Sequence, residues 1–167
     1  MSKAATASQS NREGKPQIKV VADNRRARHE YEVIEVYETG IELVGTEVKS
    51  MRNGKANLQD SFARIENGEL WLYNCHISPY DYGNRFNHDP VRKRRLLMHK
   101  REITKLKSKT QEKGLTLVPL KLFFKGNWAK LDLALAKGKQ LYDKRQSIAK
   151  RETKRDLDRV MKQVRVR

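Results

Sequence analysis

The chain contains a single cysteine, Cys75, among its 167 residues. One cysteine excludes an internal disulfide and a zinc site built from several cysteines. The sequence also has no apolar run of about 18 residues, the length that a membrane-spanning helix needs. Its first 17 residues contain no apolar stretch of the kind that a secretory signal requires. These absences predict a protein of the reducing cytoplasm.

Acidic side chains are scarce. The chain has 37 Lys and Arg against 20 Asp and Glu, a formal net charge of +17 at pH 7. Such an excess predicts a polyanionic partner, with nucleic acid as the first candidate and an anionic membrane surface as the second.

The final segment, 138–167, concentrates this charge, with eleven Lys and Arg against four Asp and Glu. Its late apolar residues have the spacing of one short helical stripe, formed by Leu157, Val160, Met161 and Val164. A segment this charged buries too little apolar surface to offset its ordering entropy. We therefore expect a tail that is disordered alone and folds against a polyanion. The alternative is a solvated helix on the protein's own surface.

Residues 18–137 are predicted to form one folded domain, preceded by a flexible lead-in, 1–17, and followed by the tail, 138–167. Residues 31–37 alternate as a strand does, with a phase slip between Val33 and Ile34 that indicates a β-bulge. Thr39-Gly40 then predicts a turn before a second strand at 41–44.

Two hairpins are predicted further along. Asn67-Gly68 joins strands at 62–66 and 69–73. Gly126-Asn127 joins strands at 116–125 and 128–136, and Leu131, Leu133 and Leu135 alternate with other residues as a half-buried strand requires. Pro119 places its strand at an edge or a bulge.

Two helices are expected. The first covers 45–53, and the second covers 91–113, with Leu96, Ile103 and Leu106 on one face and Gly114 as its end. Six or so short strands with few helices predict a mainly β fold, a small closed or partly open barrel.

Residues 24–31 place three arginines, a histidine and a tyrosine ahead of the first strand. Arginine pairs with phosphates, and Arg, His and Tyr stack on unpaired bases. The RNA-binding candidates in this segment are Asn24, Arg25, Arg26, Arg28, His29 and Tyr31. A solubilising cap on the strand is the alternative.

Residues 92–109 are strongly basic. Arg92-Lys-Arg-Arg95, Lys100, Arg101, Lys105, Lys107 and Lys109 would form one face of the predicted long helix. This face suits phosphate binding, and a solvated helix face is the alternative.

Residues 74–90 form a long polar and aromatic loop. A loop of this length is expected to be functional or to be ordered by its own packing. His76 and His88, with Asp81 or Asp89, have a spacing that fits no metal template, so a structural or RNA-contacting role is favoured and no metal site is predicted.

Enzyme motifs are missing from the sequence, which has no glycine-rich phosphate loop, nucleophile elbow or His-Glu-x-x-His. A metal-dependent nuclease would have to use Glu38, Glu47, Asp60 or Asp81, which are scattered along the chain. We therefore expect neither catalysis nor a cofactor.

Taken together and in order, several strings resemble the SsrA-binding protein family, the bacterial partners of transfer-messenger RNA. The matching strings are Asn24-Arg-Arg-Ala-Arg-His-Glu-Tyr31, Gly45-Thr-Glu-Val-Lys-Ser50, Gly54-Lys-Ala-Asn57, Asp60-Ser61, His76-Ile-Ser-Pro-Tyr80, Asn87-His-Asp-Pro90, Lys100-Arg-Glu-Ile103, Thr116-Leu-Val-Pro119, Ala136-Lys-Gly-Lys139 and Tyr142-Asp-Lys-Arg145. They cover the chain from about residue 17 to its end.

The resemblance implies an oligonucleotide-binding-type antiparallel β-barrel with flanking helices and a basic tail. It also implies ribosome rescue by trans-translation. The protein would bind the tRNA-like domain of transfer-messenger RNA, and would act with alanyl-tRNA synthetase and elongation factor Tu through that RNA. On a stalled ribosome, its tail would occupy the empty mRNA path near the small-subunit decoding region.

Individual roles also follow from the resemblance. Asn24, Glu38, Leu97 and His99 correspond to RNA-binding positions, and His99 stands where the family pattern allows Asn. The positions tied to work on the ribosome are Gly138, Lys139, Asp143, Lys144, Arg145, Val160 and Met161. Gln140 replaces a second lysine after Lys139.

Glu38 would repel phosphate, so it either accepts a hydrogen bond from a base amino group or 2′-OH, or positions a neighbouring Arg. The alternative for the whole chain is a basic ribosomal or ribosome-assembly protein whose tail threads ribosomal RNA.

Overall fold

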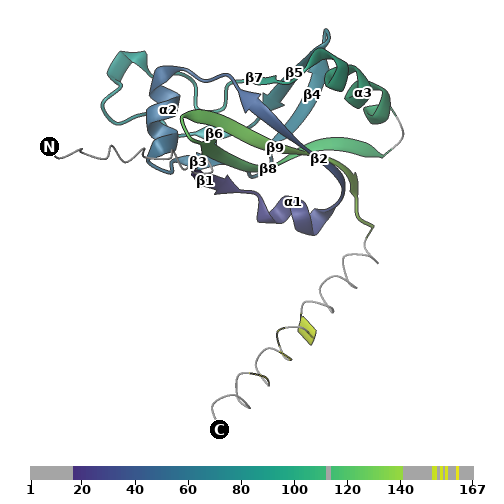
Figure 1. Ribbon diagram of the computed structural model, residues 1–167. Helices are drawn as coiled ribbons and strands as arrows, with labels where there is room; N and C mark the ends of the chain where they lie inside the picture. Colours follow the sequence, from purple (N-terminus) through teal and green to yellow (C-terminus); the bar gives the residue numbers. More distant parts are fainter. Residues whose placement is uncertain are drawn as a thin grey trace, which may run out of the picture.

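The computed structural model describes residues 17–111 and 114–140 and, in the tail, Glu152, Thr153, Arg155, Leu157 and Met161. This part is mainly β, with an antiparallel sheet and three α-helices (Figure 1). The strands are β1 (Ile18–Asp23), β2 (Tyr31–Ile41), β3 (Ala56–Asn57), β4 (Phe62–Glu66), β5 (Glu69–Tyr73), β6 (His76–Ile77), β7 (Arg94–Leu97), β8 (Leu115–Lys125) and β9 (Trp128–Gly138). The helices are α1 (Arg25–Glu30), α2 (Gly45–Arg52) and α3 (Lys100–Thr110), with a 3₁₀ turn, η1 (Asn84–Phe86).

Seven strands form the main sheet in the order β1-β8-β4-β5-β7-β2-β9, and β8 also pairs with β9. The pairings therefore lead from β8 around the sheet and back to β8. β3 and β6 form a separate two-stranded sheet. The mainly β fold is confirmed, whereas the oligonucleotide-binding barrel type stays a prediction.

Both predicted hairpins are present. β4 pairs with β5 across Asn67-Gly68, whose φ angles of 50° and 79° are left-handed, as a two-residue hairpin turn of this kind requires. β8 pairs with β9 across Gly126-Asn127 along nearly their whole length.

Both predicted irregularities are bulges in the sheet. The register of β2 against β9 shifts between Val33 and Glu35, which confirms the phase slip seen in the sequence. The register of β8 against β9 shifts between Pro119 and Lys121. Pro119 therefore lies at a bulge rather than on an edge strand, because β8 has partners on both sides.

The turn predicted at Thr39-Gly40 is wrong. β2 continues through both residues to Ile41, and its register with β9 runs to Gly40 opposite Lys130. The Thr39 hydroxyl donates to the backbone oxygen of Leu131 (3.1 Å). Glycine at position 40 allows β2 and β7 to approach closely, because a Cβ there would lie 3.2 Å from the Cβ of Leu97 on β7.

The helix predicted at 91–113 is wrong in its first half. Residues Arg94–Leu97 form β7, between β5 and β2, and α3 begins only at Lys100. Ile103 and Leu106 do face the core, whereas Leu96 reaches it from a strand. Strand pairing across the sheet overrode a local apolar spacing that suits a helix equally well.

The core has two parts, which lie on opposite faces of β9. Leu131, Leu133 and Leu135 pack into the main cluster. Ala134 and Ala136 belong to a second cluster that includes Ala27 of α1. The end of β9 is therefore buried on both faces rather than half-buried, and small alanines leave room for α1 to pack closely.

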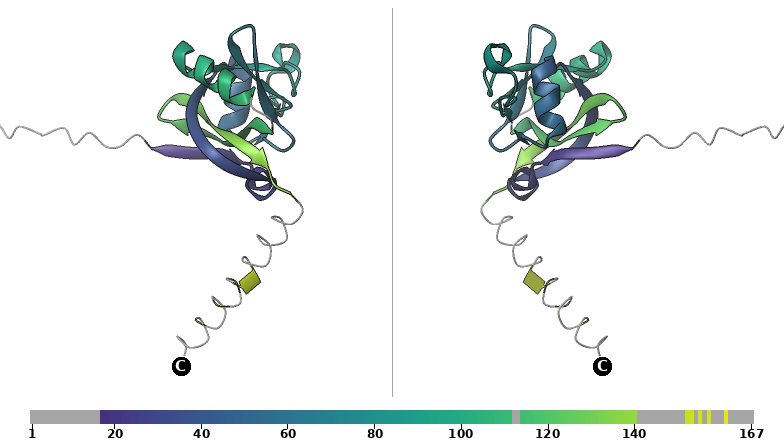
Figure 2. Two further views of the ribbon diagram at one scale, coloured as in Figure 1. Left: turned by 90° about the vertical axis from the view of Figure 1, so that its right-hand side faces the viewer. Right: turned by 90° about the vertical axis from the view of Figure 1, so that its left-hand side faces the viewer.

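Residues 24–31 were expected to lie ahead of the first strand. Instead β1 comes before them, and residues 25–30 form α1, from which the long curved β2 departs (Figure 2). None of the helices in the described part is long and apolar enough to cross a membrane.

Most of the tail lies outside the described residues, including Asp143, Lys144, Arg145 and Val160. The five tail residues that are described are helical and exposed. Disorder of the free tail and its folding against a polyanion stay predictions.

Candidate nucleic-acid interface

Asn24 fixes the short helix that carries the arginines. Its side-chain oxygen accepts a hydrogen bond from the Ala27 N–H (3.0 Å), which caps α1. Its side-chain nitrogen donates to the backbone oxygens of Leu58 (3.1 Å) and Pro119 (3.2 Å). Asn24 is only 7% exposed, so its polar atoms serve the protein and position α1.

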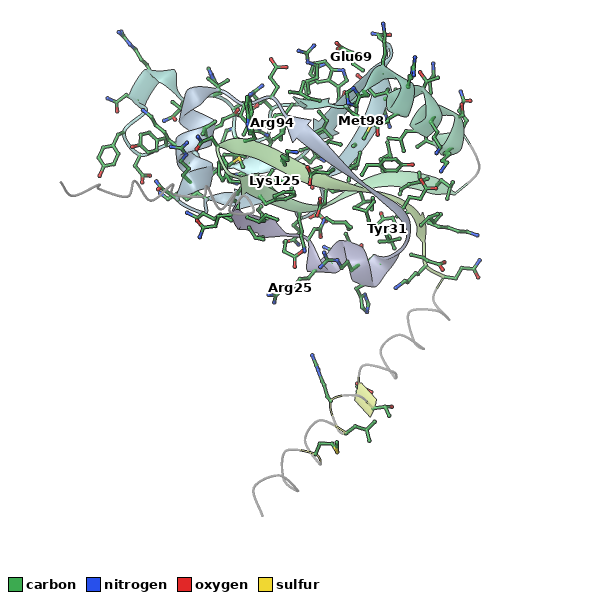
Figure 3. All side chains as sticks on the ribbon, viewed as in Figure 1. Arg25, Tyr31, Glu69, Arg94, Met98 and Lys125 are labelled. Atoms are coloured by element: carbon green, nitrogen blue, oxygen red, sulfur yellow. The ribbon has the colours of Figure 1, made fainter. Side chains whose placement is uncertain are left out.

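The basic side chains of α1 point outward. Arg25 is exposed and forms no ion pair within the described part of the chain (Figure 3). Arg26 contacts Glu30 (2.8 Å) and Asp60 (3.3 Å), and Arg28 contacts Asp23 (3.1 Å). These pairs are largely solvated and hold little energy, so the guanidinium groups remain available to phosphates.

Tyr31 lies between two surface hollows. The larger, of about 700 Å³, is also lined by Arg28, Glu32, Val33, Val36, Leu120, Asp132 and Lys139. The smaller, of about 370 Å³, is also lined by Asn24, Arg26, Ala27, Glu30, Asp60, Ser61, Phe62, Thr116 and Val118. Exposed apolar side chains, a half-buried ring and arginines thus meet beside α1, a combination that suits stacking and phosphate contact.

Glu38 lies between two lysines. Lys125 is 3.3 Å from its carboxylate, and Lys130 forms a shorter ion pair with it. The hydrogen bond from Lys130 contributes most to lowering the pKa of Glu38, and the bonds from Lys125 add to it. Burial raises this pKa but is outweighed. The carboxylate is therefore ionised and holds two ammonium groups in place. A negative charge is tolerated on this basic face because two lysines neutralise it.

Asp132 lies directly opposite Glu38 in the β2–β9 register. Partial burial raises the pKa of Asp132, the nearby Lys121 opposes this rise, and the charge of Glu38 adds to it. Since Asp132 also lines the larger hollow, Glu38 stands at the border of that hollow.

Leu97 and His99 extend the surface from β2 toward α3. Leu97 of β7 lies opposite Gly40 of β2. Gly40 is two residues from Glu38, so both positions are on the same face of β2. The Leu97 side chain is 48% exposed. His99 is exposed at the start of α3, where its carbonyl accepts hydrogen bonds from the N–H groups of Glu102 and Ile103.

The structure therefore joins most predicted RNA-binding residues in one continuous surface. It runs from the arginines of α1 past Tyr31 and the larger hollow to Glu38, Leu97 and His99. We call this the α1–β2 surface.

The basic residues 92–95 do not belong to the α1–β2 surface. Arg94 is fully buried, and it pairs with Glu47 at 2.8 Å. It also donates to the backbone oxygens of Cys75 (2.6 Å) and Pro90 (3.0 Å). Arg94 is thus a structural residue, and the expected phosphate-binding role for it is wrong.

Glu47 neutralises Arg94 and also accepts from Arg92 (2.6 Å) and from the Val44 N–H that begins α2. Burial by itself raises the pKa of Glu47, but the hydrogen bonds from Arg92 and Val44 and the charge of Arg94 outweigh it and lower the pKa.

The remaining basic residues of this region lie on α3. Lys100, Arg101, Lys105 and Lys107 are exposed, and Lys109 pairs with Glu35 of β2. This confirms a basic helix face, shorter than expected, next to His99.

The candidate metal ligands and nuclease carboxylates do not gather in one place in the described part of the chain. No three His, Cys, Asp or Glu side chains gather there as metal ligands would. Three of the four candidate nuclease carboxylates, Glu38, Asp60 and Asp81, pair with Lys or Arg on separate parts of the surface, and the fourth is buried with Arg94. Burial raises the pKa of Cys75 to about 11, which leaves its thiol protonated.

Comparison with known proteins finds a matching family model and similar relatives. The family model described as SmpB protein matches residues 21–163. The SsrA-binding protein of Carboxydothermus hydrogenoformans is 65% identical over 144 residues, which cover 86% of this chain and 97% of that relative. The SsrA-binding protein of Pelotomaculum thermopropionicum is 64% identical over 146 residues, 87% of this chain and 95% of the relative.

This chain belongs to the SmpB family. The solved structure "tmRNA-SmpB: a journey to the center of the bacterial ribosome" contains a similar chain, with 56% identity and a TM-score of 0.61, covering 71% of this chain and 84% of that one. The family resemblance inferred from the ordered strings is thereby confirmed.

Sequence reasoning missed two residues of the α1–β2 surface in this SmpB family member. Lys125 and Lys130 stand on β8 and β9, close together only because the hairpin pairs Lys130 with Phe123 and Lys125 with Trp128. The alternation of Lys130 with buried leucines was visible in the sequence, but nothing there indicated that both lysines would meet Glu38.

Proposed function

We propose that this SmpB family member binds the tRNA-like domain of transfer-messenger RNA through the α1–β2 surface and delivers it to stalled ribosomes for trans-translation. The observation that supports this most is the continuity of the surface. Outward arginines, a half-buried Tyr31, an exposed Leu97 and a lysine-flanked Glu38 form one face of matching chemistry. The SsrA-binding relatives and the solved tmRNA-SmpB structure support the same partner and the ribosome.

On this proposal, the ring of pairings through β8, β4, β5, β7, β2 and β9 is a small barrel of the oligonucleotide-binding type. Glu38 acts by holding Lys125 and Lys130 where RNA phosphates pass, and Asn24 acts by holding α1. Alanyl-tRNA synthetase and elongation factor Tu are partners through the RNA. The tail, 138–167, enters the empty mRNA path of the small subunit and contacts it with Asp143, Lys144 and Arg145.

The co-purifying RNA tests this proposal. The tagged full chain, isolated from bacteria with gentle washing, should carry one discrete small RNA of a few hundred nucleotides. In a gel-shift series, binding to the isolated tRNA-like fragment should weaken steeply with salt because lysine and arginine contacts release counterions. Bulk ribosomal RNA as the main species would favour a ribosomal or assembly protein and overturn the proposal.

A further inference from the structure

A second basic and aromatic surface lies on α2 and the loop that follows β6. It consists of Lys19, Lys49, Arg52, Lys55, Tyr80 and Tyr82, and we call it the α2 surface. Figures 1 and 3 show α2 and this loop at the left of the molecule, away from Tyr31 and from α3. None of its residues belongs to the α1–β2 surface.

The cations of the α2 surface are held in place but only one is neutralised. Lys49 lies over the ring of Tyr80 (5.5 Å), and Arg52 lies over the ring of Phe124 (6.0 Å). Lys19 donates to the backbone oxygen of Arg52 (2.9 Å). Within the described part of the chain, only Lys55 has a carboxylate partner here, Asp81 at 2.6 Å. An anion would therefore find three uncompensated positive charges already oriented.

The loop that presents the tyrosines is rigidly built. The side chain of Asn87 accepts from the backbone N–H of Tyr80 (3.0 Å) and donates to the backbone oxygen of Tyr80 (2.9 Å). Ser50 of α2 donates to the backbone oxygen of Ser78 (2.6 Å). Gly83 is required beneath this clamp, because a Cβ there would lie 2.5 Å from the Asn87 side chain. The loop is thus ordered by its own packing, and binding to it costs little ordering entropy.

Tyr82 is 83% exposed, the highest value among the described large apolar side chains of this loop. Its ring meets Tyr80 edge-to-face, with centroids 5.6 Å apart. Whichever ring contributes the edge, this contact leaves at least one face of the Tyr82 ring uncovered by Tyr80 and available to a flat partner. A nucleobase is such a partner, and stacking on aromatic rings beside a basic track is the usual mode of binding single strands.

We propose that the α2 surface binds single-stranded RNA, with a base stacked on Tyr82 and phosphates held by Lys49, Arg52 and Lys19. Charge alone would also attract an acidic membrane, but the presented tyrosines favour nucleobases. The site is separate from the surface proposed for the tRNA-like domain, so the protein holds two RNA segments at once.

Fluorescence anisotropy of a labelled 12-nucleotide oligouridine tests the proposal, with the full chain previously saturated by unlabelled tRNA-like fragment. Lys49→Ala/Arg52→Ala removes two cations from the α2 surface. The matched control is Arg64→Ala/Lys93→Ala, which removes two exposed cations that also lie over rings, those of Phe62 and Trp71, on another face. Tyr82→Ala removes the stacking ring without a change of charge.

We expect Lys49→Ala/Arg52→Ala to weaken oligouridine binding and to reduce its salt slope by about 1.4, since each phosphate contact on a single strand contributes about 0.7. Tyr82→Ala should weaken binding about fivefold or more, and Tyr82→Phe should not. The control pair should change neither value. A 4-thiouridine version of the oligonucleotide should crosslink to the segment 80–82.

Equal losses in the test pair and the control pair would show that only net charge matters and would overturn the proposal. Unchanged binding by Tyr82→Ala, or capture of phosphatidylserine vesicles in place of oligouridine, would overturn it too. Affinity for the tRNA-like fragment, measured separately on the same variants, should stay unchanged. A failure of the function proposed above would appear in that measurement, and a failure of the α2 surface only in the oligouridine series.

Discussion

The ammonium group of Lys139 donates a hydrogen bond to the backbone oxygen of Arg28 across 3.2 Å. The backbone N–H of Lys139 also donates to the backbone oxygen of Glu30 (2.9 Å). The start of the tail is therefore fastened to the last turn of α1, where helix carbonyls lack partners and favour a cation. With Asn24 at its other end, this contact stabilises a six-residue helix that would not persist alone.

Because of the contact between Lys139 and α1, we expect two truncations of the tail to differ in stability. Removal of residues 141–167 should leave affinity for the tRNA-like fragment nearly unchanged, because the α1–β2 surface and Lys139 remain. Removal of 138–167 also deletes the contacts of Lys139 and should lower the unfolding free energy by about 1 kcal/mol more. Denaturant titration and gel shift of both proteins check this. Loss of most affinity in the shorter deletion would place RNA binding in the tail.

Asn24→Ala should destabilise the protein by about 2 kcal/mol, since it removes a helix cap and leaves two backbone oxygens without their donor. Affinity for the tRNA-like fragment should fall as α1 loosens. Asn24→Asp retains the acceptor that caps α1 but lacks the side-chain donor, so its stability should lie between those of the wild type and Asn24→Ala. If Asn24→Ala lost affinity at full stability, a direct RNA contact would be indicated instead.

Glu38→Ala should weaken binding to the tRNA-like fragment about tenfold, although it makes the protein more positive, because hydrogen bonds to a charged group are lost and two lysines are released. Asp81→Ala is the matched control, since it also frees an exposed lysine, Lys55, on a different face. A gel shift of both variants is the measurement. Equal or tighter binding by Glu38→Ala would show a merely solvated charge.

Glu47→Gln should lower the unfolding free energy by about 3 kcal/mol at pH 7, because it leaves the buried Arg94 without a counter-charge. The measurement is urea denaturation of the wild type and the variant. A loss below 1 kcal/mol would mean that the backbone oxygens of Cys75, Pro90 and Arg92, which accept hydrogen bonds from Arg94, suffice.

The same pair predicts a pH dependence. Because the pKa of Glu47 in the folded protein is below its ordinary value of 4.5, its contribution is complete above that value and is lost as the pH falls through the lowered pKa. The stability difference between wild type and Glu47→Gln should stay constant from neutral pH to about 5 and shrink in more acidic solution. Other carboxylates titrate in both proteins, so only the difference is diagnostic.

The apolar stripe of the tail should matter on the ribosome and not for RNA binding. Met161 is 71% exposed and Leu157 is 59% exposed, so neither packs on the folded domain. Val160→Ser with Met161→Ser should keep affinity for the tRNA-like fragment and abolish tagging of stalled chains. In the free protein, amide exchange across the tail should be fast. Normal tagging by the double variant would show that the apolar stripe has no role and that the tail acts only as a polycation.

Several local features followed from the sequence because short-range chemistry decides them. Asn67-Gly68 favours left-handed backbone, so its hairpin needed no tertiary information. The phase slip at Val33 and the missing N–H of Pro119 likewise marked bulges within their own strands. Helix α2 was predicted within one residue of its end, since Gly54 with a φ of 74° ends it.

Tertiary structure decided what depended on partners distant in the chain. Residues 94–97 became a strand because β5 and β2 supplied hydrogen bonds on both sides, and Arg94 left the surface because Glu47, 47 residues away, met it in the interior. Lys125 and Lys130 joined Glu38 only through sheet pairing. Sequence thus determined the charge, the two hairpin turns and the family. The fold determined which cations remain free to meet RNA, because whether a cation is neutralised depends on its distance in space from a carboxylate.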